Sequence, residues 1–126
     1  MSLNKQNPPE NKILNSGLNF AMEFGENWLQ PIHQRLSFKY DFLTKNQLDE
    51  YNLICTKATK IGQEFIYKTL VEISENQETI KESHLKHNLK SFMLSDYPWI
   101  DNKNLSRLFS QVCYYAYKDG LTGCLK

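Results

Sequence analysis

Proline and glycine are scarce in the middle of this sequence. Between Pro31 and Pro98 there is no proline, and Gly62 is the only glycine. Strands joined by tight turns need such residues roughly every eight to twelve positions, so this spacing favours long helices. Valine is also rare: the chain has two valines against sixteen leucines, whereas β-branched residues are the ones that pack well on a sheet. The sequence therefore predicts an all-α fold.

Neither sign of charge dominates, and no long apolar run is present. Fifteen Lys and Arg residues stand against fourteen Asp and Glu residues, a net charge of +1, so no overall field attracts nucleic acid or an anionic membrane. No stretch approaches the roughly 18 apolar residues of a membrane span, and residues 1–16 lack the apolar core of a secretory signal. We therefore expect a cytoplasmic protein without a membrane partner, and we do not expect nucleic acid to be a partner.

Cysteine is equally scarce. Cys55, Cys113 and Cys124 are odd in number and irregularly spaced, which excludes a disulfide framework and predicts reduced thiols. Cys55 and Cys113 fall on or beside the apolar faces of predicted helices, where a thiol acts as a small inert apolar group. We expect Cys124, close to the C-terminal residue, to be exposed.

The length and composition fit one folded domain. The 126 residues are 40% hydrophobic and 13% aromatic, enough for a single core, and no internal repeat is visible. The second of two adjacent prolines, Pro8 and Pro9, forces the first into extended geometry. We therefore expect a flexible lead-in over residues 1–14 and a single helical domain over residues 15–126.

The first helix is predicted at about Leu18–Ser37, with Asn15 or Ser16 as its N-cap. Pro31 lies inside this range, and a proline removes one backbone hydrogen bond of a helix. We expect either a kink or a break into two short helices between Phe24 and Trp28.

The second helix is the longest element predicted. Thr44 and Gln47 have the spacing of a capping box, and the apolar pattern continues to about Ile73. Such a helix is on the order of 40 Å long, enough to serve as the central element. Its expected buried face consists of Tyr51, Ile54, Cys55, Ala58, Ile61, Gly62 and Phe65.

Two further helices complete the expected fold. A third is predicted at about Thr79–Leu94, with an apolar face of Leu85, Leu89, Phe92 and Met93. A fourth begins after the N-cap Asp101 and ends at Gly120. The predicted architecture is a compact bundle of about four helices with a long central second helix.

Motifs that carry catalysis or bind cofactors are missing. The sequence has no G-x-S-x-G turn, no H-E-x-x-H and no glycine-rich phosphate loop, so we assign no catalytic residue, metal or cofactor and favour a protein that is not an enzyme. His84 and His87 have a spacing that suits a metal pair, although they point away from the apolar face. A metal- or small-molecule-binding bundle, completed by Glu50, Glu64 or Glu72, is the alternative function.

The predicted third helix, which carries His84 and His87, also carries three lysines. Lys81, Lys86 and Lys90 form a basic strip, and a solvated helix face explains it better than a nucleic-acid ligand does. Arginine supplies the forked contacts of nucleic-acid recognition, and Arg35 and Arg107 are the only two arginines. Nucleic-acid binding by this strip is therefore the weaker alternative.

Aromatic residues exceed what the predicted core faces need. Phe20, Phe24 and Trp28 form a second stripe on the first helix, and Tyr67 and Tyr114 point away from the main apolar faces. Such groups are buried either within the chain or against another chain. The leading hypothesis is a small non-catalytic helical interaction or adaptor protein that self-associates, for example as a homodimer, or binds a protein partner. The interface candidates are Phe20, Phe24, Trp28, Tyr67, Tyr114, Tyr97 and Trp99.

Overall fold

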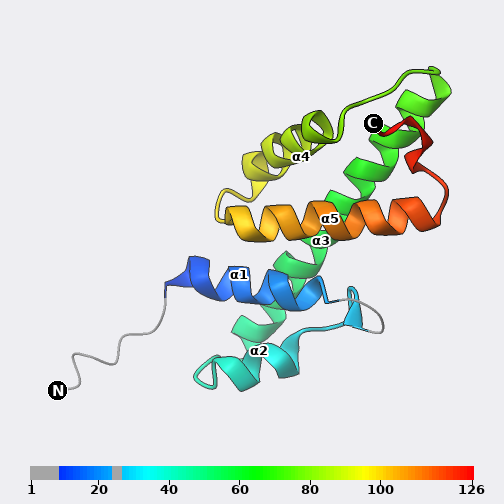
Figure 1. Ribbon diagram of the computed structural model, residues 1–126. Helices are drawn as coiled ribbons and strands as arrows, with labels where there is room; N and C mark the ends of the chain where they lie inside the picture. Colours follow the sequence, from blue (N-terminus) through cyan, green and yellow to red (C-terminus); the bar gives the residue numbers. More distant parts are fainter. Residues whose placement is uncertain (1–8, 24–26) are drawn as a thin grey trace.

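The computed structural model describes residues 9–23 and 27–126. They form five α-helices and no β-strand longer than an isolated bridge, so the all-α class is confirmed (Figure 1). Among the helices of this described part, none is long and apolar enough to cross a membrane. In chain order the elements are α1 (Glu10–Ala21), α2 (His33–Lys39), α3 (Lys45–Glu75), α4 (Glu82–Asp96), α5 (Asn102–Lys118) and a terminal 3-10 turn, η2 (Thr122–Cys124).

The long helix α3 is the element on which the others pack. Its capping box is present as expected: Gln47 N donates to Thr44 Oγ1 over 3.2 Å, and Thr44 N donates to Gln47 Oε1 over 2.8 Å. Helices α1, α2, α4 and α5 all contact α3, and Figure 1 shows α1 and α5 crossing it at successive levels. The central long helix is therefore confirmed.

The buried face of α3 is turned from the predicted one. Ile54, Ile61 and Phe65 are half-buried at its edge, whereas Thr59 and Ile66 are fully buried. The reason is that α1 and α5 contact α3 on the side of its small residues, which lets their backbones come close. The buried residues of α3 are Tyr51, Cys55, Ala58, Thr59, Gly62, Ile66 and Leu70.

The first helix begins earlier than predicted. α1 starts at Glu10, directly after Pro9, whose carbonyl accepts hydrogen bonds from the next turn. A proline is tolerated there because the first backbone amides of a helix have no partner within it. The expected lead-in is thus wrong for residues 10–14, where Ile13 and Leu14 are buried. The remainder of the expected lead-in, residues 1–8, lies outside the described residues.

The interruption expected near Pro31 is a break rather than a kink. α1 ends at Ala21 and α2 begins at His33, so the single predicted range Leu18–Ser37 contains parts of two helices. The chain between them passes through positions 24–26, which lie outside the described residues.

The C-terminal segment explains the late start of α4. This helix begins at Glu82, three residues after the predicted Thr79. The residue before its cap, Ile80, pairs instead with the C-terminal segment: Ile80 N donates to Cys124 O (2.9 Å), and Lys126 N donates to Ile80 O (2.8 Å). Both backbone groups of Ile80 are therefore used in a bridge and not in a helix, and Lys81 becomes the N-cap of α4.

Helix α5 has the predicted limits. Asp101 caps it by accepting a hydrogen bond from Asn104 N over 2.8 Å. At the other end Gly120 adopts a φ of 76°, and Leu121 N donates to Ala116 O over 2.9 Å, which is the expected C-terminal motif.

Two glycines allow the helices that cross α3 to approach it closely. A Cβ atom on Gly17 of α1 would lie 2.8 Å from Cys55 Sγ and 3.2 Å from Ile32 Cδ1. A Cβ atom on Gly62 of α3 would lie 2.7 Å from Leu108 Cδ2 of α5. Cys55, Ile32 and Leu108 are all fully buried, so these side chains have little space into which they can move.

The close crossing of α1 and α3 predicts the effect of Gly17→Ala. Overpacking costs about 1–3 kcal/mol, and the roughly 1 kcal/mol gain in helix propensity offsets part of it. We expect a net loss of about 1 kcal/mol in the free energy of unfolding, measured by urea denaturation, and a smaller loss when Cys55→Ala removes the sulfur. Gly123→Ala, where a Cβ would meet nothing within 4 Å, is the neutral control. Equal losses with and without the sulfur would contradict the close contact.

A second prediction concerns the end of α3. Gln77 has a φ of 57° in the same C-terminal motif that Gly120 completes on α5, with Glu78 N donating to Ile73 O over 3.0 Å. Since glycine adopts this conformation without strain, we expect Gln77→Gly to raise the free energy of unfolding by about 1 kcal/mol. The same substitution inside the helix, Gln63→Gly, should lower it by about the same amount. Thermal and urea unfolding measure both, and a destabilised Gln77→Gly protein would refute the strain.

Candidate protein interface

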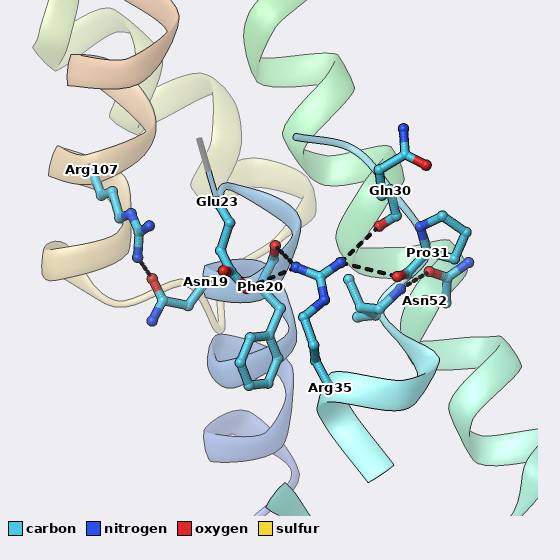
Figure 2. Close-up of polar contacts among 9 residues, drawn as sticks. Asn19, Phe20, Glu23, Gln30, Pro31, Arg35, Asn52 and Arg107 are labelled. Carbon is cyan, nitrogen blue, oxygen red and sulfur yellow. Dashed lines mark hydrogen bonds and ion pairs between the residues drawn. The ribbon is translucent and has the colours of Figure 1, made fainter. Parts of the chain in front are cut away.

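One arginine fixes the position of α2 against the end of α1 (Figure 2). Arg35 Nη1 donates to the carbonyl of Phe20 and to Glu23 Oε1, both over 2.7 Å. Its Nη2 donates to the carbonyls of Gln30 (3.2 Å) and Pro31 (3.0 Å). The planar guanidinium presents several donors in fixed directions, so a single side chain joins α1, the connecting segment and α2.

Helix α3 holds the start of α2 from the other side. Asn52 Oδ1 accepts a hydrogen bond from Ile32 N over 2.9 Å, and His33 Nε2 lies 2.8 Å from Asp49 Oδ1. The one residue that α2 buries is Leu36. Phe38 follows two residues later, which is roughly 200° around a helix, so it faces away from the core.

Phe38 is therefore an exposed aromatic side chain on α2, a helix that Arg35 and Asn52 hold in place. Phe38 is 94% exposed, the most exposed large apolar residue in the described part of the chain. With Phe20, Gln34, Arg35 and Lys39 it lines a depression of about 480 Å³, which we call the aromatic notch. The Arg35 guanidinium lies 5.8 Å from the centroid of the Phe20 ring, a favourable cation–π geometry.

A larger hollow adjoins the notch. It has a volume of about 610 Å³, and Lys39 lines both depressions. We call it the lysine hollow, because Lys12 of α1, Lys39 of α2 and Lys103 of α5 all line it. Within the described residues, none of these three lysines has a carboxylate at ion-pair distance.

The wall of the lysine hollow contains a rigid amide network. Asn15 Nδ2 donates to the carbonyl of Trp99 over 2.8 Å, and Asn15 Oδ1 accepts from Asp101 N (3.0 Å) and Asn104 Nδ2 (2.9 Å). Asn15 is therefore not the N-cap that the sequence suggested: it lies inside α1 and links this helix to the α4–α5 connection. Sequence reasoning missed this role because the partners are more than 80 residues away.

The interface candidates from the sequence divide into several groups. Trp28 and Tyr67 are half-buried: the Trp28 ring packs 4.8 Å from that of Tyr115, and Tyr67 Oη donates to Asp119 Oδ2 over 2.8 Å. Tyr97 and Trp99 are also half-buried, with ring centroids 6.1 Å apart.

Three candidates remain. Phe20 is half-buried and lines the aromatic notch. Tyr114 is 48% exposed on α5, where Lys118 Nζ lies 5.7 Å from its ring centroid, outside the notch. Phe24 lies outside the described residues. Sequence reasoning missed Phe38, although its angle from Leu36 was a signal that could have indicated it.

The metal hypothesis gains no support from the arrangement of side chains. His84 and His87 are exposed on α4, as their spacing predicted. In residues 9–23 and 27–126, no three His, Cys, Asp or Glu residues lie close enough together to hold a metal ion. Lys81, Lys86 and Lys90 are likewise exposed.

All three cysteines are free, and Cys124 is buried, contrary to expectation. The bridge between the C-terminal segment and Ile80 places Cys124 Sγ 3.5 Å from the carbonyl oxygen of Leu70. Burial raises the pKa of Cys55 to about 12. Burial, together with the charge of Glu82, raises the pKa of the half-buried Cys113 thiol to about 11. Neither of these two thiols is therefore an activated nucleophile.

Comparisons with protein-family models, with curated proteins and with solved structures give no match.

The raised pKa values predict slow thiol chemistry. At pH 8 we expect iodoacetamide to alkylate the native protein at least about tenfold more slowly than the protein unfolded in guanidinium, because the thiolate fraction is smaller. The native rate should still rise as the pH approaches 11, where unfolded thiols are already ionised. Cys113→Ser should remove most of the native reaction, since Cys55 and Cys124 are buried. Fast native alkylation at pH 8 would contradict the assigned pKa directions.

Proposed function

We propose that this chain is a small non-catalytic helical interaction or adaptor protein, and that the aromatic notch is its contact surface. The observation that carries the proposal is the 94% exposure of Phe38 on a helix that Arg35 and Asn52 hold in place. Burying a phenylalanine side chain stabilises a fold or a complex by about 1.5–3 kcal/mol. No described residue of this chain buries Phe38, so a partner that covers this side chain gains that free energy.

The composition of the notch supports a protein partner. Aromatic residues and arginine are enriched at the centres of protein interfaces. Aromatic rings bring large contact areas with few rotatable bonds, and the arginine guanidinium brings several donors in a fixed plane. Here Phe20 and Phe38 supply the apolar area, while Gln34 and Lys39 lie around it as polar groups. We include a cytoplasmic location in this proposal, because the three cysteines are free thiols, as a reducing compartment would keep them.

Self-association is the second form of this function. A two-fold dimer would place Phe38 of each copy in the notch of the other. Tyr114 and Tyr117, which are 48% and 70% exposed on α5, line no part of the notch and have no role in the proposed contact.

Photo-crosslinking from the notch tests the proposal. Phe38 is replaced by benzoylphenylalanine, and Tyr117, an exposed aromatic residue outside the notch, receives the same group as a control. In lysate of the source cells we expect a discrete adduct from position 38 and none from position 117. Excess wild-type protein should suppress the adduct, whereas Phe38→Ser protein should not. That variant should fold normally, since surface substitutions usually change stability by less than about 0.5 kcal/mol.

The opposite results would reject the proposal. If position 38 gives no adduct, or if Phe38→Ser competes as well as wild type, the notch is not the contact surface. Sedimentation velocity at several concentrations completes the test: a dimer that Phe38→Ser abolishes identifies a second copy as the partner.

A further inference from the structure

We infer that the segment recognised at this surface is acidic as well as apolar: an apolar side chain of the partner enters the aromatic notch, and carboxylates beside it in the partner's sequence reach the lysine hollow. The inference rests on the proposed function and adds the chemistry of the partner.

The two depressions are neighbours that share one lining residue, Lys39. Lys39 lies on the boundary between them, at the last turn of α2, and its Nζ is 5.7 Å from the centroid of the Tyr40 ring. The notch holds about 480 Å³ and the hollow about 610 Å³. A single extended segment that places one apolar side chain in the notch therefore continues directly over the lysines.

The hollow has an excess of positive charge. Lys12, Lys39 and Lys103 line it, and no carboxylate in the described part of the chain forms an ion pair with any of them. Among the residues that the structure describes, Asp101 is the only acidic one that lines the hollow, and its Oδ1 already accepts the hydrogen bond from Asn104 N that caps α5. Carboxylates of a partner are the groups that complement this charge.

A second copy of this chain fits the surface poorly. In a two-fold dimer through the notch, the same patch of each copy faces the other. Lys39 lines both depressions, so this pairing brings its positive charge, and those of the neighbouring lysines, near the equivalent charges of the second copy. Like charges across an interface oppose association, which favours an acidic partner over a homodimer.

Nucleic acid fits less well than an acidic peptide. The guanidinium of Arg35 already donates to four acceptors, and that of Arg107 contacts Asn19 Oδ1 (Figure 2). Both arginines are thus engaged in contacts within the chain, and the cationic side chains that line the hollow are lysines. The walls of the notch also suit an apolar side chain.

Two labelled peptides of equal length test the inference by fluorescence anisotropy. Each carries a central Leu-Trp pair, flanked by Asp and Glu in the acidic probe and by Ser and Gln in the neutral probe. We expect the acidic probe to bind at least about tenfold more tightly than the neutral probe and to weaken as salt is added. Phe38→Ser should abolish binding of both probes.

Charge reversal locates the carboxylate contacts. Lys39→Glu and Lys103→Glu should each weaken the acidic probe by about three- to tenfold. Lys103→Glu is the safer variant for folding, because an acidic residue in the first turn of α5 is favourable. Lys57→Glu, an exposed lysine of α3 that lines neither depression, is the matched control and should change nothing.

The results separate the inference from the proposed function. If the acidic and neutral probes bind equally, or the reversals have no effect, the inference fails, and the crosslink from position 38 still decides the interaction function. If neither probe binds, the inference also fails. If a single-stranded oligothymidine binds more tightly than the acidic probe, and Lys39→Glu abolishes that binding, the partner is a nucleic acid and not an acidic peptide. If the protein forms a dimer that Phe38→Ser abolishes, the partner is a second copy of this chain and not an acidic peptide.

Discussion

The arrangement of this protein depends on how closely two helices approach α3. Gly17 of α1 faces Cys55, and Gly62 faces Leu108 of α5, at separations that leave no room for a methyl group. These two contacts place α1 and α5 along the same long helix, where Asn15 joins α1 to the residues that begin α5. The notch takes residues from α1 and α2 and the hollow also from α5, so both depend on the position of α1 that the Gly17 contact sets, although Gly17 lines neither.

The parts of the fold that the sequence predicted well are those with local signals. Thr44 and Gln47 mark the start of α3 through contacts three residues apart, and Asp101 and Gly120 mark α5 in the same way. The parts it missed are decided by distant residues. The late start of α4 and the burial of Cys124 both follow from one bridge between Ile80 and Leu125, which no local pattern announces.

The candidate site shows the same division. A four-residue aromatic spacing drew attention to Phe20 and Trp28, but sequence could not show that Trp28 packs on Tyr115 of α5 while Phe20 lines the notch. The exposure of Phe38 was within reach of a helical-angle argument from Leu36. The lysine hollow was not, because its lysines come from three helices and have no common sequence pattern.

Helix α2 is only seven residues long and buries Leu36 alone. A helix this short does not persist by itself in water, so its order comes from the Arg35 and Asn52 contacts and from the burial of Leu36. The stability of α2 against local fraying is consequently below that of the molecule as a whole. Phe38 lines the aromatic notch only while α2 is helical. A partner that binds the notch therefore selects the helical state of α2, and its apparent affinity is proportional to the population of that state. Alterations at Asn52, which lines neither the notch nor the hollow, would thus tune recognition through the winding equilibrium of one short helix.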